Sequence, residues 1–304
     1  MFNRSLFGFI QGYMKVTGFG FIRNAVKYDY PIVEAISSIL PICNQFVLAV
    51  GDSEDDTLGL IKSIDSDKID IIHTVWDDSR RKGGRTLALE TDKAFDAVPE
   101  DSDWAFYIQG DEVIHEKYLE KIYAAMEKWK DDPKVEGLLF NYLHFFGSYD
   151  YVGDSRKWYR REIRVIKNKK HIRSYRDAQG FRTKDNKKLA VKYIDDVWVY
   201  HYGWVKNPYF QAEKQKSFHK LWHDDAWIDK HVSKETEFDY SNVESLKEFE
   251  GGHPQVMRDR IEKQNWVFKF DTYQKRLSFK EKLLLKVEKA TGWRVGEYKN
   301  YKVI

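Results

Sequence analysis

The stretch Asp103-Trp104-Ala105-Phe106-Tyr107-Ile108-Gln109-Gly110-Asp111-Glu112 is a short apolar run that ends on two acidic residues. A run of this length, rich in aromatic and branched residues, is typical of a strand buried on both faces of a sheet. Open α/β sheets bind ligands at the carboxyl ends of such strands. Two carboxylates are costly to bury there without a cation, so the stretch indicates a metal site that holds a phosphorylated substrate. The alternative is that Asp111 only caps a helix that follows.

The first half of the chain alternates apolar runs with segments of helical spacing. This alternation, with short connections, predicts an α/β fold with a Rossmann-like, mostly parallel sheet flanked by helices. The pattern turns helical from Pro208, which predicts a helical C-terminal extension. The expected strands are residues 16–23, 46–50, 69–75, the run from 104, 138–146, 162–166 and 197–201, and helices are expected to begin near residues 31, 58, 86, 118 and 208.

The composition is that of a folded protein, because 42% of the 304 residues are apolar and 33% are charged. The single cysteine, Cys43, excludes an internal disulfide and favours a reducing compartment such as the cytoplasm. No stretch approaches the roughly 18 apolar residues of a membrane span. Residues 1–13 lack a convincing signal-peptide pattern, and Met14 is an equally good start, so we expect them to be an extension outside the core fold.

The net charge of +3 conceals two basic segments. Residues 152–192 contain 15 Lys and Arg against 4 Asp and Glu, and residues 269–304 contain 10 against 4. The first segment predicts a site for an anionic ligand, although a solvated face is the alternative for many of its residues. Its aromatic–basic alternation at residues 157–160 is similar to a nucleic-acid surface, but no nucleic-acid fold motif accompanies it, so no nucleic-acid partner is expected. Its arginines include Arg156, Arg160, Arg161 and Arg164.

The last predicted helix, residues 279–290, carries Leu283, Leu284, Leu285 and Val287 among lysines. Such a helix can lie on a membrane surface or a partner. More often it packs on its own domain, which is the interpretation we favour, with peripheral membrane contact as the alternative.

Three of the predicted strands end on polar residues, Arg23-Asn24, Gly51-Asp52 and Gly110-Asp111-Glu112. Because the carboxyl ends of parallel strands lie on one edge of the sheet, we expect these side chains to converge. Asp52 would then accept hydrogen bonds from a nucleobase or ribose. Asp111 would bind Mg²⁺ or Mn²⁺ through oxygen.

These pieces, in this order, resemble a family 2 glycosyltransferase with the nucleotide-sugar-binding GT-A fold, over residues 14–206. Val50-Gly51-Asp52-Ser53-Glu54-Asp55-Asp56-Thr57 resembles the family's acidic second turn, and Arg81-Lys82-Gly83-Gly84-Arg85 resembles its basic glycine-containing stretch. Gln109-Gly110-Asp111-Glu112 is similar to the Asp-x-Asp motif, and His201-Tyr202-Gly203-Trp204 to a later histidine segment.

The resemblance implies roles for single residues. Asn24 and Asp52 would contact the nucleotide, Arg85 would lie near the diphosphate, and Asp111 and His201 would bind Mn²⁺ or Mg²⁺. Gln109 stands where the family has its first Asp, so an amide would contact the ribose. His201 could instead belong to an aromatic cluster with its neighbours, and Glu112 could supply either a second carboxylate or a helix-start charge.

The activity that the resemblance implies is inverting transfer of a sugar from a UDP- or GDP-sugar to a saccharide or lipid-linked acceptor. It would serve bacterial cell-surface polysaccharide biosynthesis, in the cytoplasm or at the inner face of the membrane. Asp177 is the leading candidate for the general base and Asp154 the reserve. The alternatives are a non-catalytic carbohydrate or nucleic-acid binding protein on the same scaffold and, less favoured, a metal-dependent phosphohydrolase.

The expected domain organisation follows from the same comparison. Residues 14–207 would form the catalytic domain, with a nucleotide-binding half (14–112) and an acceptor half (113–207). Residues 208–304 would form the helical C-terminal region.

Overall fold

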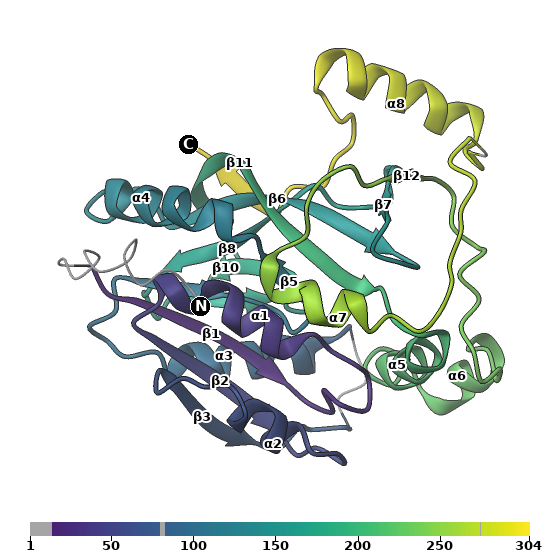
Figure 1. The fold of residues 1–304 in the computed structure, drawn as a ribbon. Helices are drawn as coiled ribbons and strands as arrows, with labels where there is room; N and C mark the ends of the chain where they lie inside the picture. The colour runs from purple at the N-terminus through teal and green to yellow at the C-terminus, as the bar shows by residue number, and fades with distance from the viewer. Residues whose placement is uncertain (1–13, 80–82, 274) are drawn as a thin grey trace.

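The computed structural model describes residues 14–79, 83–273 and 275–304, and its main feature is one large mixed sheet (Figure 1). The predicted extension at residues 1–13 lies outside the described residues. The main path of the sheet runs in the order β12-β7-β6-β8-β4-β1-β2-β3. These strands are β12 (Leu246–Glu248), β7 (Tyr151–Gly153), β6 (Gly137–Phe146), β8 (Arg161–Lys167), β4 (Trp104–Tyr107), β1 (Val16–Ile22), β2 (Gln45–Gly51) and β3 (Ile69–Thr74).

The half of the sheet built by β4, β1, β2 and β3 is parallel throughout. Helices connect these strands, as a parallel sheet requires. They are α1 (Ile32–Ile39), α2 (Thr57–Lys62) and α3 (Arg85–Asp96), and α4 (Leu119–Trp129) follows β4. The predicted α/β class, with helices flanking the sheet, is confirmed.

The core lies on both faces of this parallel half, which is why its strands read as continuous apolar runs. Side chains alternate along β2: Phe46 and Leu48 pack in a cluster with α1 and α4, whereas Val47 packs in the cluster with α3. Each strand is therefore held between two helical layers, and its carboxyl end is fixed in position.

The second half of the sheet is mixed. β8 runs antiparallel to both β4 and β6, and β11 (Leu189–Trp204) runs parallel to β6. β11 is longer than the strand predicted at residues 197–201, and its end carries the predicted histidine segment. The remaining strands are the hairpin β9 (Ile172–Tyr175) and β10 (Gly180–Thr183), and β13 (Tyr301–Val303), which pairs with β11.

The chain after Asp111 does not form a helix directly. It forms the short strand β5 (Glu112–Ile114), which pairs antiparallel with β11, and α4 begins only at Leu119. The alternative in which Asp111 caps a helix is therefore wrong, because pairing with β11 extends the backbone there. A helix-start role for Glu112 is wrong for the same reason.

The C-terminal region contains helices joined by long irregular segments. They are α5 (Pro208–Lys220), α6 (Asp225–His231), α7 (Arg258–Glu262) and α8 (Phe279–Thr291), and the 3₁₀ turn η3 (Gln255–Met257) directly precedes α7. Two other 3₁₀ turns of the described residues, η1 (Leu40–Ile42) and η2 (Glu116–Tyr118), lie earlier in the chain. α8 begins with a capping box between Ser278 and Glu281 and lies beyond β7 and β12 (Figure 1). Among the described residues, no helix is long and apolar enough to cross a membrane.

Candidate active site

A cleft of about 910 Å³ opens at the carboxyl ends of β1, β2 and β4. Of the three strand ends that the sequence singles out, the first and third line the cleft with Asn24 and Asp111, whereas the turn after β2 reaches it with Glu54 and not with Asp52. The end of β11 and the body of α5 complete the wall, together with a loop before β8 and another before β10. The lining also includes the polar and aromatic side chains of Gln109, His144, Trp158, Asp177, Gln179, His201 and Lys214.

Asp111 faces a buried cation. The ammonium Nζ of Lys214 lies 3.1 Å from Asp111 Oδ2 and also donates to the Gly203 carbonyl at 3.0 Å. Burial alone would raise the pKa of Asp111, but the positive charge of Lys214 outweighs it and holds that pKa well below its usual range. Asp111 is therefore a carboxylate, and α5 supplies the charge that offsets it.

A second buried lysine lies behind this pair. Lys206 Nζ donates to the Asp29 carbonyl at 2.5 Å, and both ammonium groups stand over the Tyr30 ring, 4.6 Å and 4.8 Å from its centroid. Burial, reinforced by the charge of Lys214, lowers the pKa of Lys206 to about 7. Two buried lysines thus lie near the Tyr30 edge of the cleft, and the charge of Lys214 is balanced by the Asp111 carboxylate.

His201 faces Asp111 from the end of β11, with Nε2 3.8 Å from Asp111 Oδ1. Its other ring nitrogen, Nδ1, lies 3.3 Å from His144 Nδ1, and His144 Nε2 lies 2.8 Å from the Tyr159 carbonyl. Burial lowers the pKa of both imidazoles, so both are neutral.

This chain of contacts determines the tautomer of His201. A carbonyl only accepts, so His144 must donate to it from Nε2, and His144 Nδ1 is left as an acceptor. His201 must then donate from Nδ1, and its Nε2 carries a free lone pair that faces Asp111. The fixed tautomer is inferred from the hydrogen-bond network.

Gly203 keeps the space between these two groups open. A Cβ atom at this position would lie 2.6 Å from His201 Cε1 and 2.8 Å from Asp111 Oδ2. Any other residue would therefore crowd both side chains, which is a physical reason for glycine beside this pair.

A divalent cation held by Asp111 and His201 would share the carboxylate with the Lys214 ammonium, which lies 3.1 Å from Oδ2. A carboxylate oxygen and a neutral imidazole nitrogen are suitable donors for Mn²⁺. Among the described parts of the chain, no three or more His, Cys, Asp and Glu side chains gather into a metal site, so the protein would contribute only these two ligands. The other ligands would have to come from the substrate or water, as is usual for Mg²⁺ bound to a phosphorylated substrate.

Of the other four predicted binding residues, two line the cleft and two do not. Asn24 lines the cleft, and its Oδ1 accepts from the Glu54 backbone nitrogen at 2.8 Å, which ties the end of β1 to the loop after β2. Gln109 also lines the cleft, and its Nε2 donates to the Ala178 carbonyl at 3.1 Å. Asp52 and Arg85 are exposed and do not line the cleft. From the acidic turn after β2, Glu54 reaches the cleft instead of Asp52.

The two base candidates differ in position. Asp177 lines the cleft, and burial raises its pKa. It lies between two non-glycine residues with left-handed backbone, Arg176 (φ 57°) and Ala178 (φ 64°), a strained arrangement that is common at functional sites. Asp154 does not line the cleft. It forms an ion pair with Lys275, in which Asp154 Oδ2 lies 2.5 Å from Lys275 Nζ.

The neighbouring acid Glu112 has a structural role. Arg164 holds it through two contacts of 2.7 Å, and Tyr142 Oη donates to it at 2.7 Å. Both side chains of the ion pair are 0% exposed. Glu112 is thus unavailable to a metal, and Arg164 is unavailable to an anionic ligand.

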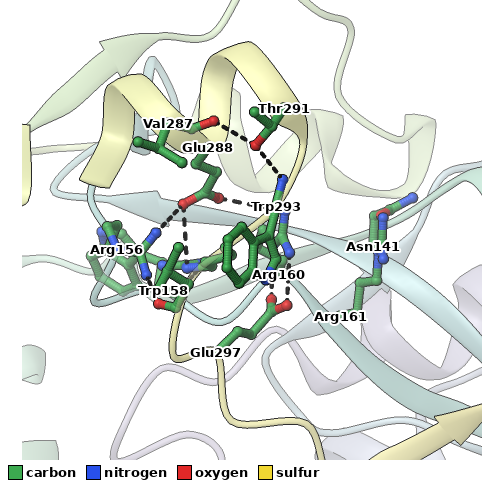
Figure 2. A network of polar contacts seen from close by, with 12 residues as sticks. Asn141, Arg156, Trp158, Arg160, Arg161, Val287, Glu288, Thr291, Trp293 and Glu297 are labelled. Carbon is green, nitrogen blue, oxygen red and sulfur yellow. Dashed lines mark hydrogen bonds and ion pairs between the residues drawn. The ribbon is translucent and has the colours of Figure 1, made fainter. Parts of the chain in front are cut away.

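The other arginines of the basic segment are also engaged within the chain (Figure 2). Arg156 lies 2.6 Å from Glu288, and Arg160 contacts both carboxylate oxygens of Glu297 at 2.8 Å and 2.7 Å. We call these four residues the α8 network. Arg161 donates to Asn141 at 3.1 Å. The predicted anion site is therefore wrong for these arginines, because acids that are distant in the sequence fold onto them.

Sequence reasoning missed Lys214 and Trp158 as residues that line the cleft. Lys214 shares the inward side of α5 with Gln211, which is fully buried. Polar residues spaced three apart on an otherwise ordinary helix are the only local signal. Trp158 lines the cleft and stacks on His144 with ring centroids 5.1 Å apart, so it offers an aromatic surface within the cleft.

No protein-family model and no curated protein matches this chain. Among solved structures it is similar to S. aureus TarS, with 12% identity and a TM-score of 0.37 over 73% of this chain and 41% of TarS. TarS residues 1–349 in complex with UDP-GlcNAc align with 18% identity and a TM-score of 0.31, over 44% of this chain and 36% of that chain. Glucosyl-3-phosphoglycerate synthase from Mycobacterium tuberculosis, in complex with Mg²⁺ and UDP, aligns with 13% identity and a TM-score of 0.29, over 43% of this chain and 44% of that chain. Superpositions this loose carry no argument about activity.

Proposed function

We propose that the cleft binds a nucleotide sugar and transfers its glycosyl group to an acceptor hydroxyl. The observation that supports this most is the ionised Asp111 at the carboxyl end of β4, which faces both the cation of Lys214 and the free lone pair of His201. A cleft at this edge of a parallel sheet, with polar groups converging from separate strands, is the usual ligand site of an α/β fold. The motif resemblance to GT-A glycosyltransferases of family 2 agrees with this proposal.

The donor would lie along the ends of β1, β2 and β4. Asn24 and the loop that it fixes after β2, including Asp52 and Glu54, would contact the nucleoside of a UDP- or GDP-sugar. Gln109 would contact the ribose, and Arg85 would lie toward the diphosphate. Lys214, which was not foreseen from the sequence, would keep Asp111 ionised and in position beside the diphosphate.

The metal belongs to the same proposal. Asp111 and His201 would hold Mn²⁺ or Mg²⁺, which when bound would offset the negative charge that develops on the leaving diphosphate. His144 would keep His201 in the tautomer that presents Nε2, which is the positioning role that outer hydrogen bonds serve at metal sites. Gly203 would leave room for the ion.

The reaction would be inverting. The acceptor oxygen would attack the anomeric carbon on the face opposite the diphosphate, and the bond from that carbon to the diphosphate oxygen would break with its electron pair. Asp177 would take the proton of the attacking hydroxyl. Its raised pKa makes it a better base than an ordinary aspartate. Asp154, paired with Lys275 outside the cleft lining, is the weaker candidate.

The acceptor would be a saccharide or a lipid-linked saccharide. The exposed edge of the Trp158 ring system offers a platform on which a sugar ring can pack. From the motif resemblance we assign the reaction to bacterial cell-surface polysaccharide assembly in the cytoplasm.

The proposal is tested by incubating the full chain with UDP- and GDP-sugars and Mn²⁺, with and without saccharide acceptors, and measuring release of the nucleoside diphosphate. We expect release with one nucleotide class. Asp177→Asn should lower the rate by about 100-fold or more while nucleotide binding is retained. Binding without any release would favour a non-catalytic binder, and no binding of either nucleotide would contradict the proposal.

A further inference from the structure

The outward side of α8 combines exposed apolar and basic side chains. Phe279 is 84% exposed and Leu283 is 52% exposed, and with the exposed Ala290 they recur at the spacing of one helix face. Trp293, directly after the helix, is 64% exposed. Eight of the twelve exposed large apolar side chains of the described residues lie between residues 267 and 304, and three of them, Phe279, Leu283 and Trp293, belong to α8 or directly follow it.

Lysines lie beside this apolar strip and, at Lys286, within it. Lys280, Lys282, Lys286 and Lys289 are exposed, and no carboxylate of the described residues lies within ion-pair distance of any of them. Long lysine side chains next to exposed aromatic and aliphatic groups are the composition of helices that lie in a membrane interface.

The acids of this region are turned toward the protein. Glu281 is held in the capping box by Ser278, and Glu288 and Glu297 belong to the α8 network beneath the helix (Figure 2). Within α8 the carboxylate of Glu288 therefore points toward the protein, whereas Lys280, Lys282, Lys286 and Lys289 are exposed. The result is an outward face that is both apolar and positive.

We propose that this face of α8 binds the surface of a bilayer that contains anionic lipids. The apolar strip of Phe279, Leu283 and Trp293 enters the headgroup region, and the lysines contact the lipid phosphates and other anionic headgroups. A membrane explains the face better than a protein partner does, because α8 buries none of its own residues fully and its exposed lysines have no acidic counterpart nearby.

The position of α8 connects this surface to the cleft. Arg294, just after the helix, donates to the Trp158 carbonyl at 2.9 Å, and Lys157, Trp158 and Tyr159 line the cleft. The residues on which α8 docks are thus adjacent to the cleft wall. If the proposed glycosyl transfer holds, a lipid-linked acceptor lying in the bilayer would reach the cleft from this side.

The test is flotation of the full chain with neutral phosphatidylcholine vesicles and with vesicles that also contain phosphatidylglycerol. We expect the chain to float with the anionic vesicles only, and to be released as the salt concentration rises. Lys282→Glu/Lys286→Glu should weaken this binding about tenfold or more, since each lysine near an anionic surface contributes to the attraction. Phe279→Ser/Leu283→Ser should weaken it several-fold.

The matched control is Lys62→Glu/Lys121→Glu, which changes the net charge equally on exposed residues of α2 and α4 and should leave flotation unchanged. Failure to float with anionic vesicles, equal loss in the control, or equal binding to both vesicle types would overturn the inference. The inference would also be overturned if the chain self-associates through this face and thereby fails to bind the vesicles. Nucleotide binding without vesicles tests the proposed function separately, so the two can fail independently.

Discussion

The Glu112–Arg164 pair beneath the cleft and the α8 network use the same residue types at similar distances, 2.7 Å and 2.6–2.8 Å. They differ in their surroundings. The first pair is 0% exposed on both sides, whereas side chains of the network are 11–28% exposed. A buried charge that loses its partner is costly, and a partly solvated one is compensated by water. The comparison indicates that a fully buried ion pair supports the cleft. The ion pairs that attach α8 are partly exposed, so removing one should change the free energy of unfolding only slightly.

The largest expected effect is on the buried pair. Arg164→Met leaves the Glu112 carboxylate in the core without its cation, so we expect a loss of about 3–5 kcal/mol in the free energy of unfolding, measured with urea. The double variant Glu112→Gln/Arg164→Met should recover part of the loss, because no charge is then left unpaired. A loss below about 1 kcal/mol for Arg164→Met would show that the pair is not the support that we describe.

The next effect is on pH dependence near the same pair. Burial raises the pKa of Glu162 from 4.5 to about 8. The folded chain therefore keeps a proton between these values that the unfolded chain releases, so stability falls as pH rises from about 4.5 to about 8.

At about 1.4 kcal/mol per pKa unit, the difference between these two values corresponds to a loss of about 4–5 kcal/mol. Glu162→Gln can still accept the hydrogen bond from Gln179 and should flatten this dependence. Urea unfolding at pH 5 and pH 8.5 measures both proteins. Equal slopes for the two would contradict the assignment.

A smaller effect is expected on nucleotide affinity when a residue of the cleft itself is changed. Gly203→Ala should fold but bind nucleotide with Mn²⁺ at least about tenfold more weakly, which is about 1.4 kcal/mol, because the added Cβ crowds Asp111 and His201. Gly252→Ala is the matched control, since its nearest neighbour would be 4.0 Å away. Titration of the nucleotide with Mn²⁺ into both variants measures the two affinities. Equal affinities would mean that the bound metal and nucleotide do not occupy the space beside Gly203.

The smallest effect is expected in the α8 network. Glu297→Ala removes the partner of Arg160 where water can replace it, so we expect a loss of about 1 kcal/mol or less in the free energy of unfolding. Asp229→Ala breaks the exposed pair with Lys234, which is 3.9 Å apart, and should cost almost nothing. A loss for Glu297→Ala that approaches the Arg164→Met value would abolish the contrast between the two regions.

Local sequence pattern was sufficient for the parallel half of the fold. Apolar runs such as 46–50 are decided by burial on both faces, and the acids that follow them mark the strand ends. Asp111 could therefore be placed at the cleft edge before any coordinates. The same rule could not tell Asp111 from Glu112, because their partners, Lys214 and Arg164, lie 103 and 52 residues away in sequence.

The rest of the site depends on contacts that no local pattern shows. In the acidic turn after β2, the Asn24 side chain accepts from the Glu54 backbone nitrogen, and Glu54 lines the cleft whereas Asp52 does not. Strand β5 forms where a helix was considered, because β11 offers it a pairing edge. Tertiary pairing overrides local preference in such cases.

The most direct measurement is the thermal shift of the full chain with UDP or GDP in the presence of Mn²⁺, compared between the wild type, Asp111→Asn and Asp154→Asn. The account predicts that one nucleotide stabilises the wild type and Asp154→Asn equally and leaves Asp111→Asn unchanged, because a bound ligand raises the melting temperature only where its site is intact. An equal shift in Asp111→Asn and the wild type would contradict it.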